Sequence, residues 1–293
     1  MPEQVEILTT ADGRRLEVFT AGAEDGETVI AHGGTPSSGR TFGPLLDAAR
    51  ERGLRHVSYA RPGYSESDRH EGRTVADCVA DVAAIADHLG VARFHTLGAS
   101  GGGPHALACA ALLGDRVVSA ASIAGAAPRE ADGLDWYAGM GEENIEEYER
   151  ADRGASALRP WLEREAERVA EMRPEDIAEA LGDLVSEVDR AALTGDLAEF
   201  FAASFPEAVK RDVSGWLDDD LAFVRPWGFD LDRIRAPVTI WHGAQDRFVP
   251  FAHGRWLAEH VPASRSRLLA EHGHLSLSIA HYGDVLDELI SEG

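Results

Sequence analysis

The amino-acid sequence predicts an α/β fold in which a mostly parallel β-sheet is covered by helices on both faces. Short apolar segments alternate with helical segments up to residue 127 and again from residue 227. The apolar segments are almost uninterrupted, as expected for parallel strands that are buried on both sides. Residues 128–226 contain helical periodicity and no strand pattern. We therefore expect a core domain of residues 1–127 and 227–293 with an inserted all-helical cap at 128–226.

The first part of the chain predicts a β-hairpin followed by strands and helices in turn. The turn dipeptide Asp12-Gly13 separates two strand-like segments, residues 5–10 and 14–22. Further strands are expected at residues 28–31, 55–59, 93–97 and 117–124, and helices at 42–52, 74–89 and 106–113. The helix at 74–89 has the clearest ends, because Thr74 suits the N-cap, with Asp77 at the third helical position, and Gly90 ends it.

The second part of the chain predicts helices alone and then a return to alternation. Within the cap, helices are expected at residues 160–172, 174–185 and 193–205. After it come a strand at 237–241, a helix at 251–260, a strand at 265–269 and a final helix at 276–290. In a parallel sheet, catalytic groups belong at the carboxyl ends of the strands.

Charge and cysteine usage exclude several classes of protein. The 293 residues include 51 acidic and 28 basic side chains, a net charge of −23, so nucleic acid and anionic membranes should repel the chain. Cys78 and Cys109 lie in apolar helical segments and predict core positions rather than a disulfide. From the sequence we expect neither a signal peptide nor a membrane span. We expect a cytoplasmic protein with a small-molecule substrate and no nucleic-acid or membrane partner; the oligomeric state stays open.

The sequence GASGG at residues 98–102 is the strongest candidate for a functional motif. It follows a predicted strand and precedes a predicted helix, which is the context that a G-x-S-x-G nucleophile motif requires. Gly98 and Gly102 remove Cβ atoms where the chain turns sharply around Ser100, and the helix N-terminus offers free N–H groups beside the hydroxyl. A phosphate-binding loop would need a lysine that is absent. On its own the motif is equally compatible with a glycine-rich turn that has no chemistry.

With this motif, the chain resembles the α/β-hydrolase superfamily along essentially its whole length. The family order is serine, then an acid, then histidine. Asp246 follows Ser100 in the loop after the strand at 237–241, and His274 follows in the sequence EHGHL at 271–275, after the last strand. The 28 residues between Asp246 and His274 leave room for one helix and one strand, which is the arrangement that the family uses.

The resemblance implies a role for each of these residues. Ser100 would be the nucleophile, His274 its general base and Asp246 the group that orients the imidazole. The backbone N–H of Gly101 and that of Gly34, by similarity to the family's His-Gly loop, would form the oxyanion hole. No cofactor is expected. His272 and His274 are the only hint of a metal site, and their spacing is too slight a signal for zinc.

Several residues are alternatives to these assignments. His272 competes with His274 as the base, although the family places the base directly after a glycine. The sequence GAAP at 125–128, where some relatives carry the acid, has no carboxylate before Glu130. His32 and His242 are expected to hydrogen-bond within loops at strand ends, and His105 to lie along its helix.

The cap carries most of the negative charge, with 26 acidic and 11 basic residues between positions 129 and 226. Its carboxylates, such as Glu142-Glu143 and Asp218-Asp219-Asp220, are interpreted as a solvated face. The loop RPGYSES at 61–67 resembles a family turn and is assigned a structural role without chemistry. Aromatic residues in and near the cap are candidates for the substrate pocket or, more of them, for the cap core: Trp136, Tyr137, Trp161, Phe200, Phe201, Trp216 and Trp227.

A serine nucleophile argues against haloalkane dehalogenases and epoxide hydrolases, which use aspartate at that position. The His32-Gly33-Gly34 sequence resembles proline iminopeptidases, but Thr35-Pro36 and Gly101 depart from their pattern. We expect a carboxylic ester hydrolase that acts on a small or medium apolar ester. The alternatives are a proline iminopeptidase-like aminopeptidase, a C–C bond hydrolase, a perhydrolase, and a ligand-binding protein that retains the triad.

Overall fold

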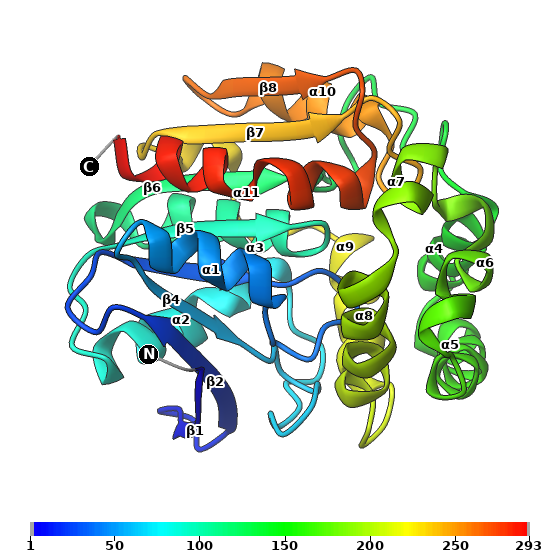
Figure 1. Cartoon of the computed structure of the whole chain (residues 1–293), viewed down its shortest axis with the longest axis horizontal. Helices are drawn as coiled ribbons and strands as arrows, with labels where there is room; N and C mark the ends of the chain where they lie inside the picture. The colour runs from blue at the N-terminus through cyan, green and yellow to red at the C-terminus, as the bar shows by residue number, and fades with distance from the viewer. Residues whose placement is uncertain (1–2, 292–293) are drawn as a thin grey trace.

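The computed structural model describes residues 3–291, within which eight strands form one sheet (Figure 1). The strands are β1 (Gln4–Thr9), β2 (Arg15–Gly22), β3 (Thr28–His32), β4 (Arg55–Tyr59), β5 (Phe94–Ala99), β6 (Val117–Ile123), β7 (Val238–Gly243) and β8 (Arg265–Leu269). Their order across the sheet is β1-β2-β4-β3-β5-β6-β7-β8. The β1–β2 and β2–β4 pairs are antiparallel, and every later pair is parallel. The predicted α/β class and mostly parallel sheet are confirmed.

Helices cover both faces of the sheet, as the sequence predicts. Figure 1 shows α1 (Gly43–Glu51) and α11 (His274–Ser291) in front of the strands. The opposite face carries α2 (Cys78–His88), α3 (Gly102–Leu112) and α10 (Phe251–His260). Successive strand residues point to opposite faces, so Val29 packs with the α1–α11 side and Ile30 with the α2–α3 side.

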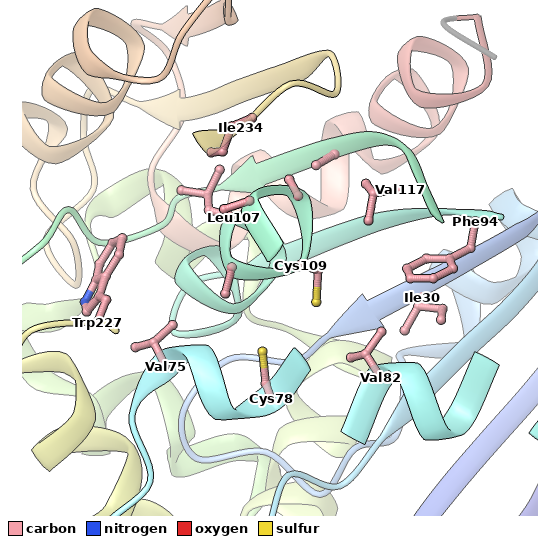
Figure 2. Close-up of a cluster of buried hydrophobic side chains, with 14 of the residues drawn as sticks. Ile30, Val75, Cys78, Val82, Phe94, Leu107, Cys109, Val117, Trp227 and Ile234 are labelled. Carbon is pink, nitrogen blue, oxygen red and sulfur yellow. The ribbon is translucent and has the colours of Figure 1, made fainter. Parts of the chain in front are cut away.

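The α2–α3 side of the sheet holds a large apolar cluster (Figure 2). Ile30, Phe94 and Val117 from the strands meet Val82 of α2 and Leu107 of α3 there. Cys78 and Cys109 lie in the same cluster as free thiols, which confirms that they are core residues. This packing fixes α3, and therefore the turn that precedes it, against the sheet.

The segment between β6 and β7 contains helices and no strand within the described residues. They are α4 (Glu142–Asp152), α5 (Ala155–Ala170), α6 (Ile177–Ala180), α7 (Glu187–Ala192), α8 (Gly195–Ala208) and α9 (Ser214–Phe223), with short 3₁₀ turns among them. Figure 1 places them beyond the carboxyl ends of β5 and β7. We call residues 128–226 the helical segment; their separation as a domain stays a prediction.

Two helices expected in the helical segment differ from the structure in their extent. The helix expected from residue 160 begins at Ala155 and contains Pro160, because Gly154 accepts the first-turn bonds from Ala157 and Leu158. The helix expected at 174–185 is broken, since Gly182 adopts φ +53° and ends α6. Within residues 3–291, no helix has the length and apolar character needed to cross a membrane.

Candidate active site

Ser100 lies in the sharp turn between β5 and α3. Its φ of 55° is in the left-handed region, and its N–H donates to the carbonyl oxygen of Ile123 at 2.8 Å. The two glycines around it are required sterically. A Cβ on Gly98 would lie 2.0 Å from the Gly102 oxygen, and a Cβ on Gly102 would lie 2.1 Å from the His32 oxygen. The strained turn holds the Ser100 hydroxyl out at the carboxyl edge of the sheet.

Asp246 and His274, which are far apart in the sequence, are in direct contact. The His274 ring donates from Nδ1 to Asp246 Oδ2 at 2.7 Å, and both side chains are buried. The other carboxylate oxygen, Oδ1, accepts the backbone N–H groups of Phe248 and Val249, each at 2.9 Å. Although burial opposes ionisation, the nearby His274 and the hydrogen bonds lower the pKa of Asp246 to about 2. The carboxylate is therefore fixed and ionised at neutral pH.

The structure brings a further carboxylate, Asp189 of α7, to the loop that carries His274. Its oxygens accept the backbone N–H groups of His274, Leu275 and Ser276 at 2.8, 3.0 and 2.9 Å. Asp189 thus satisfies the free N–H groups of the first turn of α11. A Cβ on Gly273 would lie 2.2 Å from Asp189 Oδ2, which explains why a glycine precedes His274. Sequence reasoning missed Asp189, because no local pattern links it to a helix 85 residues away.

Both carboxylates, Asp246 and Asp189, affect the pKa of His274. Burial disfavours its protonated form, but Asp246 and, more weakly, Asp189 outweigh this effect and raise the pKa of His274 above its ordinary value of 6.5. The ring stacks on Phe248 with centroids 4.7 Å apart. With Nδ1 committed to Asp246, Nε2 is the nitrogen available to other partners.

The other histidines named from the sequence have different main partners, although His242 Nε2 also lies 3.4 Å from Asp246 Oδ2. His272 contacts His281, with 3.0 Å between their Nε2 atoms, rather than Asp246. His242 donates from Nε2 to the Val249 oxygen at 2.8 Å, in the loop after its own strand as expected. His32 instead contacts residues of neighbouring strands, Tyr59 and Thr96, so that prediction was wrong in detail. His105 lies on α3 as expected, hydrogen-bonded to the Gly101 oxygen.

Ser100, His274 and Gly34 line one cavity of about 210 Å³. Much of its wall is apolar and comes from both the core and the helical segment: Phe42, Leu45, Leu181, Leu197, Phe200, Phe201, Phe205 and Phe248. Two of the seven aromatic residues named from the sequence, Phe200 and Phe201, are in this wall. Within residues 3–291, no hydrogen bond joins the Ser100 hydroxyl to the His274 ring.

Two unpaired backbone N–H groups flank Ser100. Within the described chain, the N–H groups of Gly34 and Gly101 donate no hydrogen bond. A Cβ on Gly34 would lie 3.4 Å from the Ser100 Cβ, which shows how closely that loop approaches the serine. These are the two donors that the sequence assigns to an oxyanion hole.

The carboxylates of α9 contradict the sequence prediction. Asp218, Asp219 and Asp220 were expected on a solvated face, but their exposed fractions are 2%, 0% and 0%. All ten residues of α9 are buried, since the helix packs between the core and the rest of the helical segment. Asp219 pairs with Arg61 and Arg73 of the core, and Asp218 pairs with Arg69.

A second cavity, of about 90 Å³, adjoins Ser100 and is lined by Glu143 and Glu147. Burial raises the pKa of Glu147 to about 7, although Oε1 accepts a hydrogen bond from Trp216 at 2.5 Å. Burial, together with Glu147, also raises the pKa of Asp220, whose two oxygens have no hydrogen-bond partner in the described chain. The pKa values of these two neighbouring carboxyl groups are therefore both shifted upward, mainly by burial.

Possible metal ligands do not cluster in the described residues: no group of three or more His, Cys, Asp or Glu side chains is arranged to hold an ion. The buried titratable groups near Ser100 instead pair with arginines, with backbone N–H groups or with each other. The chemistry that this arrangement supports is proton transfer and charge stabilisation by the chain's own groups.

Comparison with known proteins places the chain in a family. A model of the alpha/beta hydrolase fold matches residues 28–279. The uncharacterized hydrolase YcgS of Bacillus subtilis (strain 168) is 25% identical over 281 residues, which cover 94% of this chain and 93% of the relative. The putative carbamate hydrolase RutD of Caulobacter sp. (strain K31) is 27% identical over 271 residues, which cover 90% of each chain.

Solved structures share the whole architecture. An enol-lactonase from Burkholderia xenovorans LB400 has a TM-score of 0.71 at 18% identity and covers 98% of this chain and 100% of its own. At that identity the likeness shows the fold. The family match and the two sequence relatives go further: the protein belongs to the alpha/beta hydrolase fold family and is a hydrolase.

Proposed function

We propose that the protein is a carboxylic ester hydrolase that uses Ser100 as nucleophile, His274 as general base and Asp246 as the group that orients the base. The observation that carries the proposal is the shared cavity wall. Ser100 on the elbow and His274, already bonded to a buried carboxylate through Nδ1, line one apolar cavity. The hydrogen bond between nucleophile and base is often long in the absence of substrate and tightens when substrate binds.

The proposed reaction proceeds through an acyl-enzyme. The Ser100 oxygen attacks the ester carbonyl carbon while His274 Nε2 takes the hydroxyl proton. The N–H groups of Gly34 and Gly101 stabilise the negative oxygen of the tetrahedral intermediate. His274 then gives the proton to the departing alcohol. A water molecule attacks the acyl-enzyme by the same route and releases the acid.

The cavity supports a small or medium apolar substrate. Its volume of about 210 Å³ lies below the roughly 300–1,000 Å³ typical of drug-sized ligand sites. Phe200, Phe201 and Leu197 of α8 supply part of the wall, so an acyl or alcohol group there would be removed from water. Longer chains would clash with these side chains.

The experiment is a series of p-nitrophenyl esters of increasing acyl length. We expect kcat/KM to be highest for short or medium chains and to fall for long ones. Phe201→Ala should move the optimum to longer chains, because it enlarges the cavity without touching Ser100 or His274. Absence of turnover for every ester, with turnover of an aminoacyl arylamide or a diketone instead, would overturn the proposal in favour of an aminopeptidase or a C–C bond hydrolase.

A second candidate, an aminopeptidase-like activity, is favoured by the position of Glu147 in the second cavity beside Ser100. A substrate ammonium there would favour the ionised form of Glu147, whose pKa burial otherwise raises. The neighbouring Glu143 is already paired with Arg168 at 2.6 Å, which leaves less negative charge for a ligand. The two candidates separate on matched arylamides: an aminopeptidase cleaves the free-amine compound and loses activity on its N-acetylated form.

A further inference from the structure

The two N–H groups beside Ser100 are held in different ways. The Gly101 N–H is part of the peptide group between Ser100 and Gly101. The carbonyl oxygen of this peptide, that of Ser100, accepts a hydrogen bond from the Gly103 N–H at 2.9 Å. The first turn of α3 therefore fixes that peptide. The Gly34 N–H belongs to a loop, residues 33–42, that contains neither helix nor strand. Regular structure does not set the direction of that N–H, so another group has to do so.

Arg61 contacts this loop at two successive carbonyls. Its Nη1 donates to the Gly33 oxygen at 2.5 Å and its Nη2 to the Gly34 oxygen at 2.6 Å. In a trans peptide the C=O and N–H point to opposite sides, and the peptide between Gly33 and Gly34 is trans. By holding the Gly33 oxygen, Arg61 also sets the direction of the Gly34 N–H. The planar guanidinium is suited to this task because its donors form a rigid fork.

Asp219 of α9 fixes Arg61 in turn. Its Oδ2 accepts from Arg61 Nη2 at 2.6 Å, from the Tyr64 hydroxyl at 2.9 Å and from Thr35 Oγ1 at 2.9 Å. Its Oδ1 accepts from Arg73 Nη1 at 2.6 Å. The carboxylate is fully buried, and despite burial the two arginines hold the pKa of Asp219 far below its usual range. Asp219 is therefore a permanent anion at the junction of α9 and the Gly34 loop.

We propose that Arg61, anchored by Asp219 of the helical segment, is a positioning residue that directs the Gly34 N–H toward the oxyanion of the tetrahedral intermediate. The proposal rests on the serine hydrolase function proposed above. It gives the helical segment a part in the chemistry besides covering the cavity. It also assigns a role to the 61–67 loop, for which the sequence indicated structure alone.

The test compares Arg61→Lys with a matched ion-pair variant. Lysine keeps the charge that Asp219 needs but cannot contact both carbonyls as a fork. Because loss of one oxyanion donor lowers kcat about 10²–10³-fold, we expect R61K to lower kcat by roughly 10²-fold while KM changes little. The inhibition constant of a trifluoromethyl ketone, which forms a tetrahedral oxyanion on serine, should weaken by the same factor as kcat/KM. A substrate-like ground-state inhibitor should bind as before.

The control is Asp218→Asn, which breaks the neighbouring pair between α9 and Arg69 without touching the Gly34 loop. It should retain wild-type kcat and ketone affinity. If R61K does not fold, Thr35→Val takes its place, since it removes the hydroxyl that bridges Arg61 and Asp219 but buries no unpaired charge. For T35V we expect a smaller loss of ketone affinity than for R61K, again without loss of ground-state binding.

The outcomes separate the two proposals. If wild-type Ser100 reacts with a fluorophosphonate but the Arg61 or Thr35 variant loses no more kcat and ketone affinity than D218N, the positioning role is overturned and the serine hydrolase function stands. If wild-type Ser100 does not react at all, the proposed function fails, and the positioning role fails with it.

Discussion

Replacing Asp189 by asparagine should weaken both the stability of the protein and the basicity of His274. The carboxylate accepts three backbone N–H groups at the start of α11 and is fully buried. Asparagine offers a single oxygen, and its NH₂ group would face an N–H. Losing one or two hydrogen bonds to a charged group, at about 1.5–3 kcal/mol each, gives an expected destabilisation of roughly 1.5–6 kcal/mol.

The electrostatic consequence of D189N has a definite sign. The negative charge of Asp189 helps raise the pKa of His274. Without it the imidazolium is less stable, so the pKa falls and the acid limb of the kcat/KM–pH profile moves to lower pH. Urea unfolding at fixed pH measures the first effect, and the pH profile measures the second.

Glu187→Gln is the matched control, because Glu187 lies in the same helix, carries the same charge and is exposed. It should leave both quantities near their wild-type values. An acid limb that stays in place in D189N, with unfolding at the wild-type urea concentration, would refute the account of Asp189.

Three further predictions concern protonation and charge. His274→Ala should abolish ester turnover, whereas His272→Ala should keep both turnover and the acid limb of the pH profile. The midpoint of that limb should lie above pH 6.5, because Asp246 raises the pKa of His274. Loss of activity in H272A instead would assign the role of general base to His272. Because burial raises the folded-state pKa of Glu147 from 4.5 to about 7, the contribution of this group to wild-type stability should fall by on the order of 3 kcal/mol as pH rises between these values. Glu147→Gln keeps an acceptor for Trp216 but cannot ionise. The free energy of unfolding of this variant, relative to wild type, should therefore be higher at pH 8 than at pH 5 in urea unfolding. An equal difference at both pH values would contradict this. The acidic excess of residues 129–226 should repel anionic esters, so their kcat/KM should rise with salt while that of neutral esters stays flat; parallel curves would mean that the charge does not reach the cavity.

The features that the sequence predicted well are those that short-range patterns encode. The elbow is an example, because the close approaches at Gly98 and Gly102 exclude any side chain and leave a visible glycine spacing. The strands follow from apolar runs. Thr74 and Asp77 do pair at the start of the predicted helix, with the Thr74 N–H donating to Asp77 Oδ2 at 2.6 Å, but they cap a 3₁₀ turn at Val75–Asp77 that precedes α2. The contact between Asp246 and His274 was expected from the resemblance to the α/β-hydrolase superfamily, whose order of serine, acid and histidine the chain follows.

The features that the sequence did not indicate depend on distant partners. Asp219 is 158 residues from Arg61, and nothing in three successive aspartates shows that arginines of another loop will neutralise them. Asp189 likewise caps a helix to which the chain returns 85 residues later. Helices α4, α7 and α9 were not predicted individually. In this segment, burial is decided by packing against the core, which local periodicity does not encode.

The measurement that tests the central claim most directly is stoichiometric labelling with a fluorophosphonate, followed by peptide mapping. Only a serine with a base and oxyanion donors reacts rapidly with this reagent. We predict one label per chain, on Ser100, with loss of labelling and a fall in turnover of about three orders of magnitude or more in Ser100→Ala. Equal labelling of wild type and S100A, or a label on another residue, would contradict the claim.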